Sequence, residues 1–113
     1  MSSTDVAIQG YHAHVYFNAE TKARALDLFR SIEGRFPVVM GRVHERPVGP
    51  HPQWSYQVAF KPEAFGDVVP WLAVHRDGLV VFVHAETGDA LRDHTDHVIW
   101  LGPSDTLDIA KLG

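Results

Sequence analysis

The stretch YHAHVYF, residues 11–17, predicts a β-strand with two unlike faces. Successive side chains of an extended strand point to opposite faces of the sheet. The odd-numbered positions form an apolar face: Tyr11, Ala13, Val15 and Phe17. The even-numbered positions form a polar face: His12, His14 and Tyr16. Two histidines and a tyrosine are not the usual solvent-facing residues of a strand, so this face is predicted to line a functional site.

Four further strands are predicted from alternating or continuous apolar runs. They cover residues 37–45, 53–60, 79–84 and 97–102. The run LVVFVH at 79–84 is nearly all apolar, so this strand is expected to be central and buried on both faces. Gly41 is expected to bend or bulge the second strand.

Two helices are predicted between these strands by apolar residues at helical spacing. The first covers residues 18–34 and the second lies within 61–76. Gly66 is expected to interrupt the second helix. Asp67 would then cap a new start, and Pro70 would fall in the first turn, where proline costs least.

The order of these elements is β-α-β-β-α-β, followed by one more strand. Residues 85–96 are expected to form a polar loop, and residues 103–113 a last short helix capped by Ser104 or Asp105. This order predicts an α+β protein with a ferredoxin-like βαββαβ antiparallel sheet, both helices on one face and an extra C-terminal strand. Residues 1–113 are expected to form a single domain.

Composition excludes several classes of function. Ten lysines and arginines against fourteen acidic residues give a net charge of −4, which argues against a nucleic-acid partner. No apolar run is long enough to span a membrane, and the first ten residues do not resemble a secretory signal. A cytoplasmic location is therefore expected, and residues 1–9 are expected to be flexible. The absence of cysteine excludes disulfides, thiolate nucleophiles and cysteine-based metal sites.

Histidine is unusually abundant in this chain. Eight histidines are dispersed over the sequence, at positions 12, 14, 44, 51, 75, 84, 94 and 97. Histidine titrates near neutral pH and is the commonest metal ligand in proteins. Because there is no cysteine, any transition-metal site here must combine histidine with aspartate, glutamate or water.

Histidines from two strands are expected to meet on the polar face. In the predicted fold the first and last strands of the βαββαβ unit are neighbours, about 4.8 Å apart. His84 ends the last of these strands and could reach the same face as His14. Imidazoles on adjacent strands can converge on one ion. His12 and His14 could chelate a metal together, or one could ligate while the other acts as an acid–base or substrate-binding group.

Two further histidines lie in predicted loops, where binding residues concentrate. His51 lies in GPHP and His94 in RDHTD. Asp93 could orient a ligating histidine by accepting its second ring N–H, or it could be a turn residue. Any single histidine could instead be an ordinary structural residue. Three others are expected at the surface or at strand ends: His44, His75 and His97.

Several motifs, taken in order and spacing, resemble one protein family. HVYF, VGPHP, HAETGD and DHT followed by WLG resemble the DOPA 4,5-dioxygenase family, over nearly the whole chain from His14 to Leu101. The resemblance implies extradiol ring cleavage of DOPA or a related catechol by O2 at a non-haem Fe(II) centre. Zinc or another divalent metal could occupy the same site in a purified sample.

The resemblance also suggests roles for individual histidines. His14, His51 and His84 are the candidate metal ligands, and His94 and His12 are the candidate acid–base or substrate-positioning groups. His94 could replace His51 as a ligand. The nearest acidic candidates, in the loop after His84, are Glu86 and Asp89.

Two alternatives remain open at the level of sequence. One is a cofactor-free ferredoxin-like enzyme whose histidines do acid–base work alone. The other is a non-catalytic module that binds a small aromatic molecule or a metal. A homodimer is also expected, because ferredoxin-like sheets with an open face often dimerise to cover it.

Overall fold

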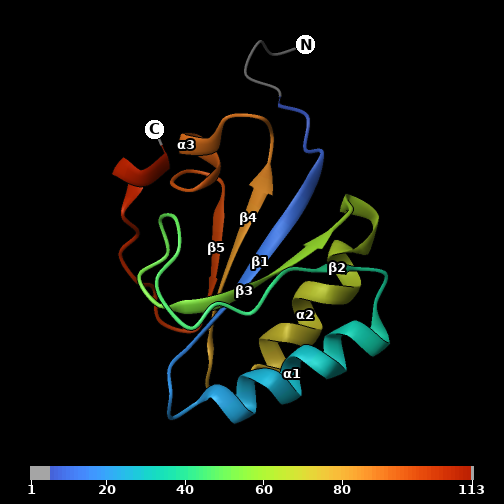
Figure 1. Cartoon of the computed structure of the whole chain (residues 1–113). Helices are drawn as coiled ribbons and strands as arrows, with labels where there is room; N and C mark the ends of the chain where they lie inside the picture. Colours follow the sequence, from blue (N-terminus) through green and yellow to red (C-terminus); the bar gives the residue numbers. More distant parts are fainter. Residues whose placement is uncertain (1–5, 113) are drawn as a thin grey trace.

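The chain folds around one five-stranded antiparallel sheet. The computed structural model describes residues 6–112. The strands are β1 (Gly10–Phe17), β2 (Val39–Met40), β3 (Trp54–Phe60), β4 (Val80–Glu86) and β5 (Val98–Leu101). Their order in the sheet is β2-β3-β1-β4-β5 (Figure 1). This is the predicted ferredoxin-like βαββαβ arrangement, with the extra strand β5 added beside β4.

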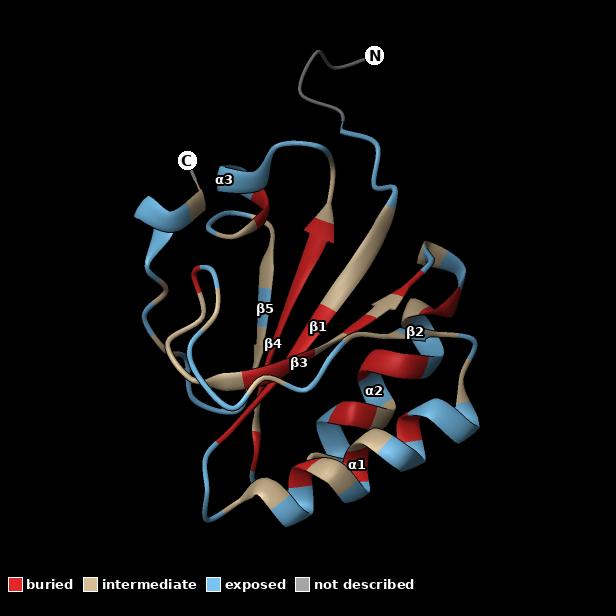
Figure 2. Ribbon diagram, viewed as in Figure 1, coloured by how far each residue is buried: buried red, intermediate tan, exposed pale blue. Residues whose placement is uncertain are grey.

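Two helices cover one face of the sheet. They are α1 (Lys22–Arg35) and α2 (Phe65–His75). Their buried residues pack against the odd-numbered side chains of β1 and β4 in one apolar core. Figure 2 shows the buried positions of both helices turned toward the strands. The Tyr56 hydroxyl also donates a hydrogen bond of 2.7 Å to the carbonyl of Ala25, which ties α1 to β3.

The opposite face of the sheet is covered by irregular chain. The segment between β2 and β3, a short helix α3 (Ala90–Asp93) and a C-terminal 3₁₀ turn η2 (Ile109–Leu112) lie on this side (Figure 1). The amide of Asp108 donates to the carbonyl of Pro50 at 2.9 Å, which joins the C-terminal segment to the loop that carries His51. On the polar face of β1, His14 and Tyr16 are therefore buried, whereas His12 near the start of the strand keeps 27% of its side chain exposed.

The second strand is shorter than predicted. Regular pairing is confined to Val39–Met40, although the Gly41 amide still donates to the carbonyl of Gln57 and His44 forms an isolated bridge with Ser55. A Cβ on residue 41 would lie 3.2 Å from that of Gln57. The close approach explains why glycine stands where the strand bends, as expected.

The second helix differs from the prediction in where it breaks. A 3₁₀ turn, η1 (Pro62–Ala64), begins at Pro62 and continues directly into α2 at Phe65. Gly66 therefore lies near the start of a continuous helix, and Pro70 lies inside it rather than in its first turn. The helical segment begins at Pro62 and not after Gly66, because proline is favoured in the first turn of a helix.

Two predictions for the loops and termini need correction. Residues 85–96 are not a loop throughout, because they contain the last residues of β4 and helix α3. The final turn begins only at Ile109, so neither Ser104 nor Asp105 caps it. Of the segment expected to be flexible, residues 1–5 lie outside the described part. Within residues 6–112, no helix is both long and apolar enough to cross a membrane.

Candidate metal centre

The even-numbered side chains of β1 and β4 lie side by side on the face of the sheet that the loops cover. His12 lies directly opposite His84, and His14 lies opposite Phe82. His84 therefore reaches the histidine face of β1, as the fold prediction required. His14 and His84 are almost fully buried, with 5% and 1% of their surface exposed.

Three imidazoles converge at this point. The ligand nitrogens of His12, His14 and His84 all lie within 4.8 Å of one another. The Nε2 atoms of His14 and His84 are 3.1 Å apart. Two ligands at right angles around one ion, with metal–nitrogen bonds of about 2.1 Å, are separated by about 3 Å. The spacing of this pair thus suits adjacent ligands, and the three histidines together could hold a metal ion.

Burial keeps these imidazoles neutral. Desolvation lowers the pKa of His14 well below its usual value, and neighbouring histidines lower it further. Desolvation likewise lowers the pKa of His84 to about 4, although the carbonyl of Ala85 opposes the shift. For His12, burial lowers the pKa more than the carboxylate of Glu86 raises it. Neutral imidazole is the form that binds a metal, so the cluster is ready to ligate at neutral pH.

Hydrogen bonds at Nδ1 place the lone pairs of two rings on Nε2, where the lone pair of His84 accepts a hydrogen bond from His14 at 3.1 Å. His12 Nδ1 lies 2.6 Å from Glu86 Oε1, and His84 Nδ1 lies 3.0 Å from the carbonyl oxygen of Ala85. Both oxygens accept, so the proton of each neutral ring is on Nδ1 and its lone pair is on Nε2. Metal-binding histidines are typically held in this way by a carboxylate or a carbonyl.

The loop before β3 brings His51 over the cluster. Its ring centroid lies 4.1 Å from that of His14, and its Nδ1 lies 2.7 Å from the hydroxyl of Tyr16. Burial raises the pKa of Tyr16, so its hydroxyl stays protonated and can donate to His51. Burial also lowers the pKa of His51 to about 4. His51 is thus a neutral imidazole beside the cluster, bound to a tyrosine rather than grouped with the three converging nitrogens.

Helix α3 brings the ring of His94 beside that of His84. Its ring centroid lies 4.1 Å from that of His84 and 6.4 Å from that of His51. The Nδ1–H of His94 donates to the carbonyl of Ala90 at 2.7 Å, which leaves a lone pair on Nε2. This hydrogen bond holds the ring of His94 next to the cluster.

A buried carboxylate fixes the segment that carries His94. Asp93 is 1% exposed and accepts hydrogen bonds from the amide and hydroxyl of Thr87 and from the ring of His97. Burial alone would raise the pKa of Asp93, but these bonds outweigh it and lower the pKa. From the sequence, Asp93 was a candidate to orient a ligating histidine. Its hydrogen bonds instead go to Thr87 and His97, which close the loop around α3.

Aromatic side chains line the remainder of the enclosed face. Phe82 packs between the histidines and β5, with its ring 4.5 Å from that of Trp100 and 6.0 Å from that of His14. Trp100 also approaches Tyr16 at 6.2 Å. The sequence patterns did not assign Phe82 or Trp100 to the site. Their even-numbered positions on β4 and β5 were the signal that could have placed them beside the histidines.

The structure brings all five candidate histidines to one region. His12, assigned to acid–base work from the sequence, falls within the three-histidine cluster, whereas His51, assigned as a ligand, contacts Tyr16. Asp89 caps α3 by accepting from the amide of Arg92, and Glu86 contacts His12. His75 lies apart, stacked on Trp71 at 4.2 Å.

Comparisons with known proteins agree on one family. The profile of the Dopa 4,5-dioxygenase family matches residues 11–111. A DOPA 4,5-dioxygenase of Amanita muscaria is 37% identical over 117 residues, which cover 96% of this chain and 51% of the fungal protein. An uncharacterised 21.2 kDa protein of Botryotinia fuckeliana is also 37% identical, over 96% of this chain and 66% of its own length. This chain therefore spans about half to two thirds of these fungal relatives.

A solved structure extends the comparison to three dimensions. The crystal structure of a candidate dioxygenase from Nostoc punctiforme matches with a TM-score of 0.92 at 48% sequence identity. The match covers 93% of this chain and 91% of the cyanobacterial chain. The two proteins thus share their fold over nearly their full described lengths.

Proposed function

Because the chain belongs to the Dopa 4,5-dioxygenase family, we propose that it is an Fe(II)-dependent extradiol dioxygenase that cleaves DOPA or a related catechol. The observation that carries the proposal is the buried cluster of His12, His14 and His84, whose ligand nitrogens lie within 4.8 Å of one another. Non-haem iron enzymes need a few protein ligands on one side of the metal and open positions on the other.

In this proposal His12, His14 and His84 hold the iron. We prefer this ligand set to His14, His51 and His84 because its three ligand nitrogens converge. The Nδ1 of His51 is instead hydrogen-bonded to the Tyr16 hydroxyl. The common two-histidine, one-carboxylate set is not reproduced, because Glu86 bonds to a ring nitrogen of His12. The bound iron would supply the electronic coupling between catechol and O2 that a protein side chain cannot provide.

The chain's own residues would transfer protons and exclude water from the site. His94 lies beside the cluster, with its Nδ1 bonded to the carbonyl of Ala90, and would accept a proton from a catechol hydroxyl at Nε2. His51, in contact with the Tyr16 hydroxyl and beside His14, would return a proton as the ring opens. Phe82 and Trp100 provide an apolar wall that would exclude water and strengthen electrostatic interactions inside the site.

Metal dependence separates this proposal from a cofactor-free enzyme. The protein is stripped with a chelator, reloaded anaerobically with Fe(II) or Zn(II), and assayed for ring cleavage with DOPA. Activity is expected to vanish on stripping and to return with Fe(II) alone. Activity that survives complete removal of metal would contradict the proposal and favour histidine-only catalysis. Catechol binding without cleavage by the Fe(II) protein would favour a non-catalytic binding module.

A His14→Ala variant tests the ligand set directly. It is expected to lose Fe(II) on gel filtration, whereas a His75→Ala control should retain the wild-type stoichiometry, because His75 lies on α2 away from the cluster. Full iron content and full activity in His14→Ala would exclude the proposed site.

A further inference from the structure

Tyr16 is the third side chain on the histidine face of β1, and its hydroxyl is engaged by a residue from a loop. The hydroxyl oxygen lies 2.7 Å from Nδ1 of His51, which is 35 positions along the chain. The ring of His51 in turn lies beside that of His14, with the two centroids 4.1 Å apart. One hydrogen bond therefore joins the strand that carries two candidate metal ligands to an imidazole that lies next to them.

The direction of this hydrogen bond follows from the burial of Tyr16. Only 2% of the residue is exposed, and within residues 6–112 the one hydrogen-bond partner of its hydroxyl is His51. If His51 donated from Nδ1, the phenolic hydrogen would be left in the interior without an acceptor, which costs free energy. If the hydroxyl donates, its hydrogen and the lone pair on Nδ1 are both satisfied. Tyr16 is therefore the donor, and the neutral ring of His51 carries its proton on Nε2.

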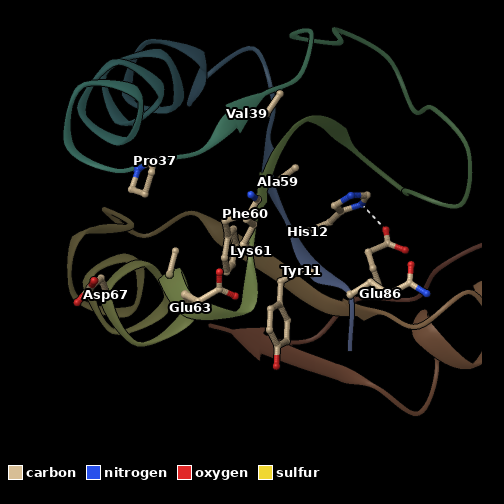
Figure 3. Close-up of a pocket in the computed structure, with 13 residues that line it drawn as sticks. Tyr11, His12, Pro37, Val39, Ala59, Phe60, Lys61, Glu63, Asp67 and Glu86 are labelled. Carbon is tan, nitrogen blue, oxygen red and sulfur yellow. Dashed lines mark ion pairs between the residues drawn. The ribbon is translucent and has the colours of Figure 1, made fainter. Parts of the chain in front are cut away.

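Two neighbouring histidines are held in the opposite sense. His12 Nδ1 lies 2.6 Å from a carboxylate oxygen of Glu86, a contact shown in Figure 3. His84 Nδ1 lies 3.0 Å from the carbonyl oxygen of Ala85. These oxygens accept, so each of the two rings keeps its proton on Nδ1. A partner at one ring nitrogen decides whether the other nitrogen donates or accepts. The partner at Nδ1 thus sets a different tautomer for these two rings than for the ring bound to the tyrosine.

The loop that carries His51 is held independently of the tyrosine hydroxyl. The amide of Asp108 donates to the carbonyl of Pro50 at 2.9 Å, and the side-chain amide of Gln53 donates to the carboxylate of Asp105 at 3.1 Å. These two contacts flank His51 in the sequence and join its loop to the C-terminal segment. Removal of the tyrosine hydroxyl is therefore expected to change the tautomer of the ring more than the position of the loop.

We propose that Tyr16 is a positioning residue that fixes the tautomer of His51 and so makes this ring a hydrogen-bond donor beside the metal cluster. In the fixed tautomer Nε2 carries the proton and has no lone pair for a metal, which keeps His51 outside the ligand set. The same N–H suits an anionic oxygen of the substrate. A preorganised donor that meets developing negative charge speeds a reaction by about 10²- to 10³-fold. The inference rests on the proposed function, because the substrate must bind at the histidine cluster.

Nitrogen NMR of the metal-free protein tests the tautomer without turnover. The protein is labelled with ¹⁵N-histidine and recorded at about pH 8, above the ordinary pKa of histidine. The spectrum of His51→Gln identifies the signals of His51. In the wild type, Nε2 is expected to have the chemical shift of a protonated ring nitrogen and Nδ1 that of an unprotonated one. In Tyr16→Phe the two shifts should move toward each other, because a ring without the hydroxyl populates both tautomers.

Tyr56→Phe is the matched control for this experiment. It also removes a buried hydroxyl with a hydrogen bond of 2.7 Å, but that bond goes to the carbonyl of Ala25 on the helix side of the sheet. The control should leave both nitrogen shifts of His51 at their wild-type values. A wild-type His51 that is protonated on Nδ1, or shifts that Tyr16→Phe leaves unchanged, would overturn the proposal.

A double-mutant cycle on the Fe(II) protein tests whether Tyr16 acts through His51. Tyr16→Phe alone is expected to lower kcat for DOPA about ten-fold, with KM within about two-fold of wild type, because the lost donor acts mainly in the transition state. In a His51→Gln background the same substitution should have no further effect. Additive effects would indicate a separate structural role for Tyr16 and overturn the proposal. Absence of ring cleavage by the wild type would refute the proposed function, whereas the NMR result would still decide whether Tyr16 fixes the tautomer.

Discussion

The buried histidines make the metal-free protein sensitive to mild acid, and His84 allows the effect to be calculated. Burial lowers the pKa of this residue from 6.5 to about 4 in the folded chain. Below about pH 6.5 the imidazole of His84 binds a proton in the unfolded chain but stays neutral in the folded chain, so a fall in pH favours unfolding. The stability contribution is fully present above 6.5 and is lost progressively as the pH falls toward 4.

The magnitude follows from the folded and unfolded pKa values of His84. A tenfold difference in proton affinity between the two states corresponds to about 1.4 kcal/mol, so the complete loss is about 3 kcal/mol. Most of it, about 2 to 3 kcal/mol, falls between about pH 7.5 and about pH 4.5. For a domain whose total stability is on the order of 5–15 kcal/mol, this is a large fraction.

The assay is urea unfolding of the chelator-treated protein at these two pH values, for the wild type and for His84→Gln. Glutamine does not titrate and can still accept a hydrogen bond from His14, so the variant removes the proton-binding site while keeping a polar partner. The free energy of unfolding of the wild type should fall by about 2 to 3 kcal/mol more than that of the variant. Equal falls in the two proteins would refute the reasoning that burial holds His84 neutral.

Other consequences of the structure can be checked with equally simple measurements. Replacing Glu86 by Gln should weaken Fe(II) affinity by about 10- to 100-fold, as is usual when the hydrogen-bond partner of a metal-binding histidine is altered; calorimetry of metal binding measures this, and an unchanged affinity would argue against His12 as a ligand. Asp93→Asn should lower the free energy of unfolding by about 2 kcal/mol, because a buried acceptor of three hydrogen bonds is weakened; chemical denaturation would show it, and a neutral effect would contradict the role given to the Thr87 and His97 contacts. The homodimer expected from the sequence was to cover an open face of the sheet, and in the structure loops and α3 cover much of that face; light scattering after size-exclusion chromatography tests the proposal, which twice the chain mass would support and a mass of one chain would exclude.

The sheet and its two faces could be predicted because one strand alternates cleanly. In β1 the even and odd positions differ so strongly that only one orientation buries the apolar side. The face of His84 was harder to predict, since the run LVVFVH is apolar on both sides and gives no alternation to follow. It was the pairing of β1 with β4, an expectation from the fold, that brought His84 toward His14.

The choice among histidines could not be made from sequence. His12 and His51 are both close to the metal region, and spacing alone does not reveal which ring turns toward it. Glu86, two residues beyond His84 on β4, reaches across to bond His12. The proline-bounded loop delivers His51 to Tyr16, a contact between residues 35 positions apart. Such pairings depend on how loops cross the sheet, which local sequence patterns do not encode.

The short helix α3 could not be predicted from the sequence. Helix α3 has four residues, fewer than are needed for an apolar period to become visible. Asp89 caps it through the amide of Arg92, and this aspartate was considered only as a possible metal ligand. Asp93 can be buried because Thr87 and His97 donate hydrogen bonds to its carboxylate. The polar sequence around it gave no indication of this burial.

In the proposed function, the buried histidine face is the site of oxygen-dependent ring cleavage. Oxygen consumption by the anaerobically prepared Fe(II) protein, on mixing with DOPA and oxygenated buffer, tests it most directly, with absorbance of the ring-opened product recorded on the same sample. We expect one O2 to be consumed for each DOPA cleaved, with appearance of a yellow product, and both signals to be lost in His84→Ala. Absence of oxygen uptake by iron-loaded wild-type protein with DOPA and other catechols, or full activity in His84→Ala, would contradict it.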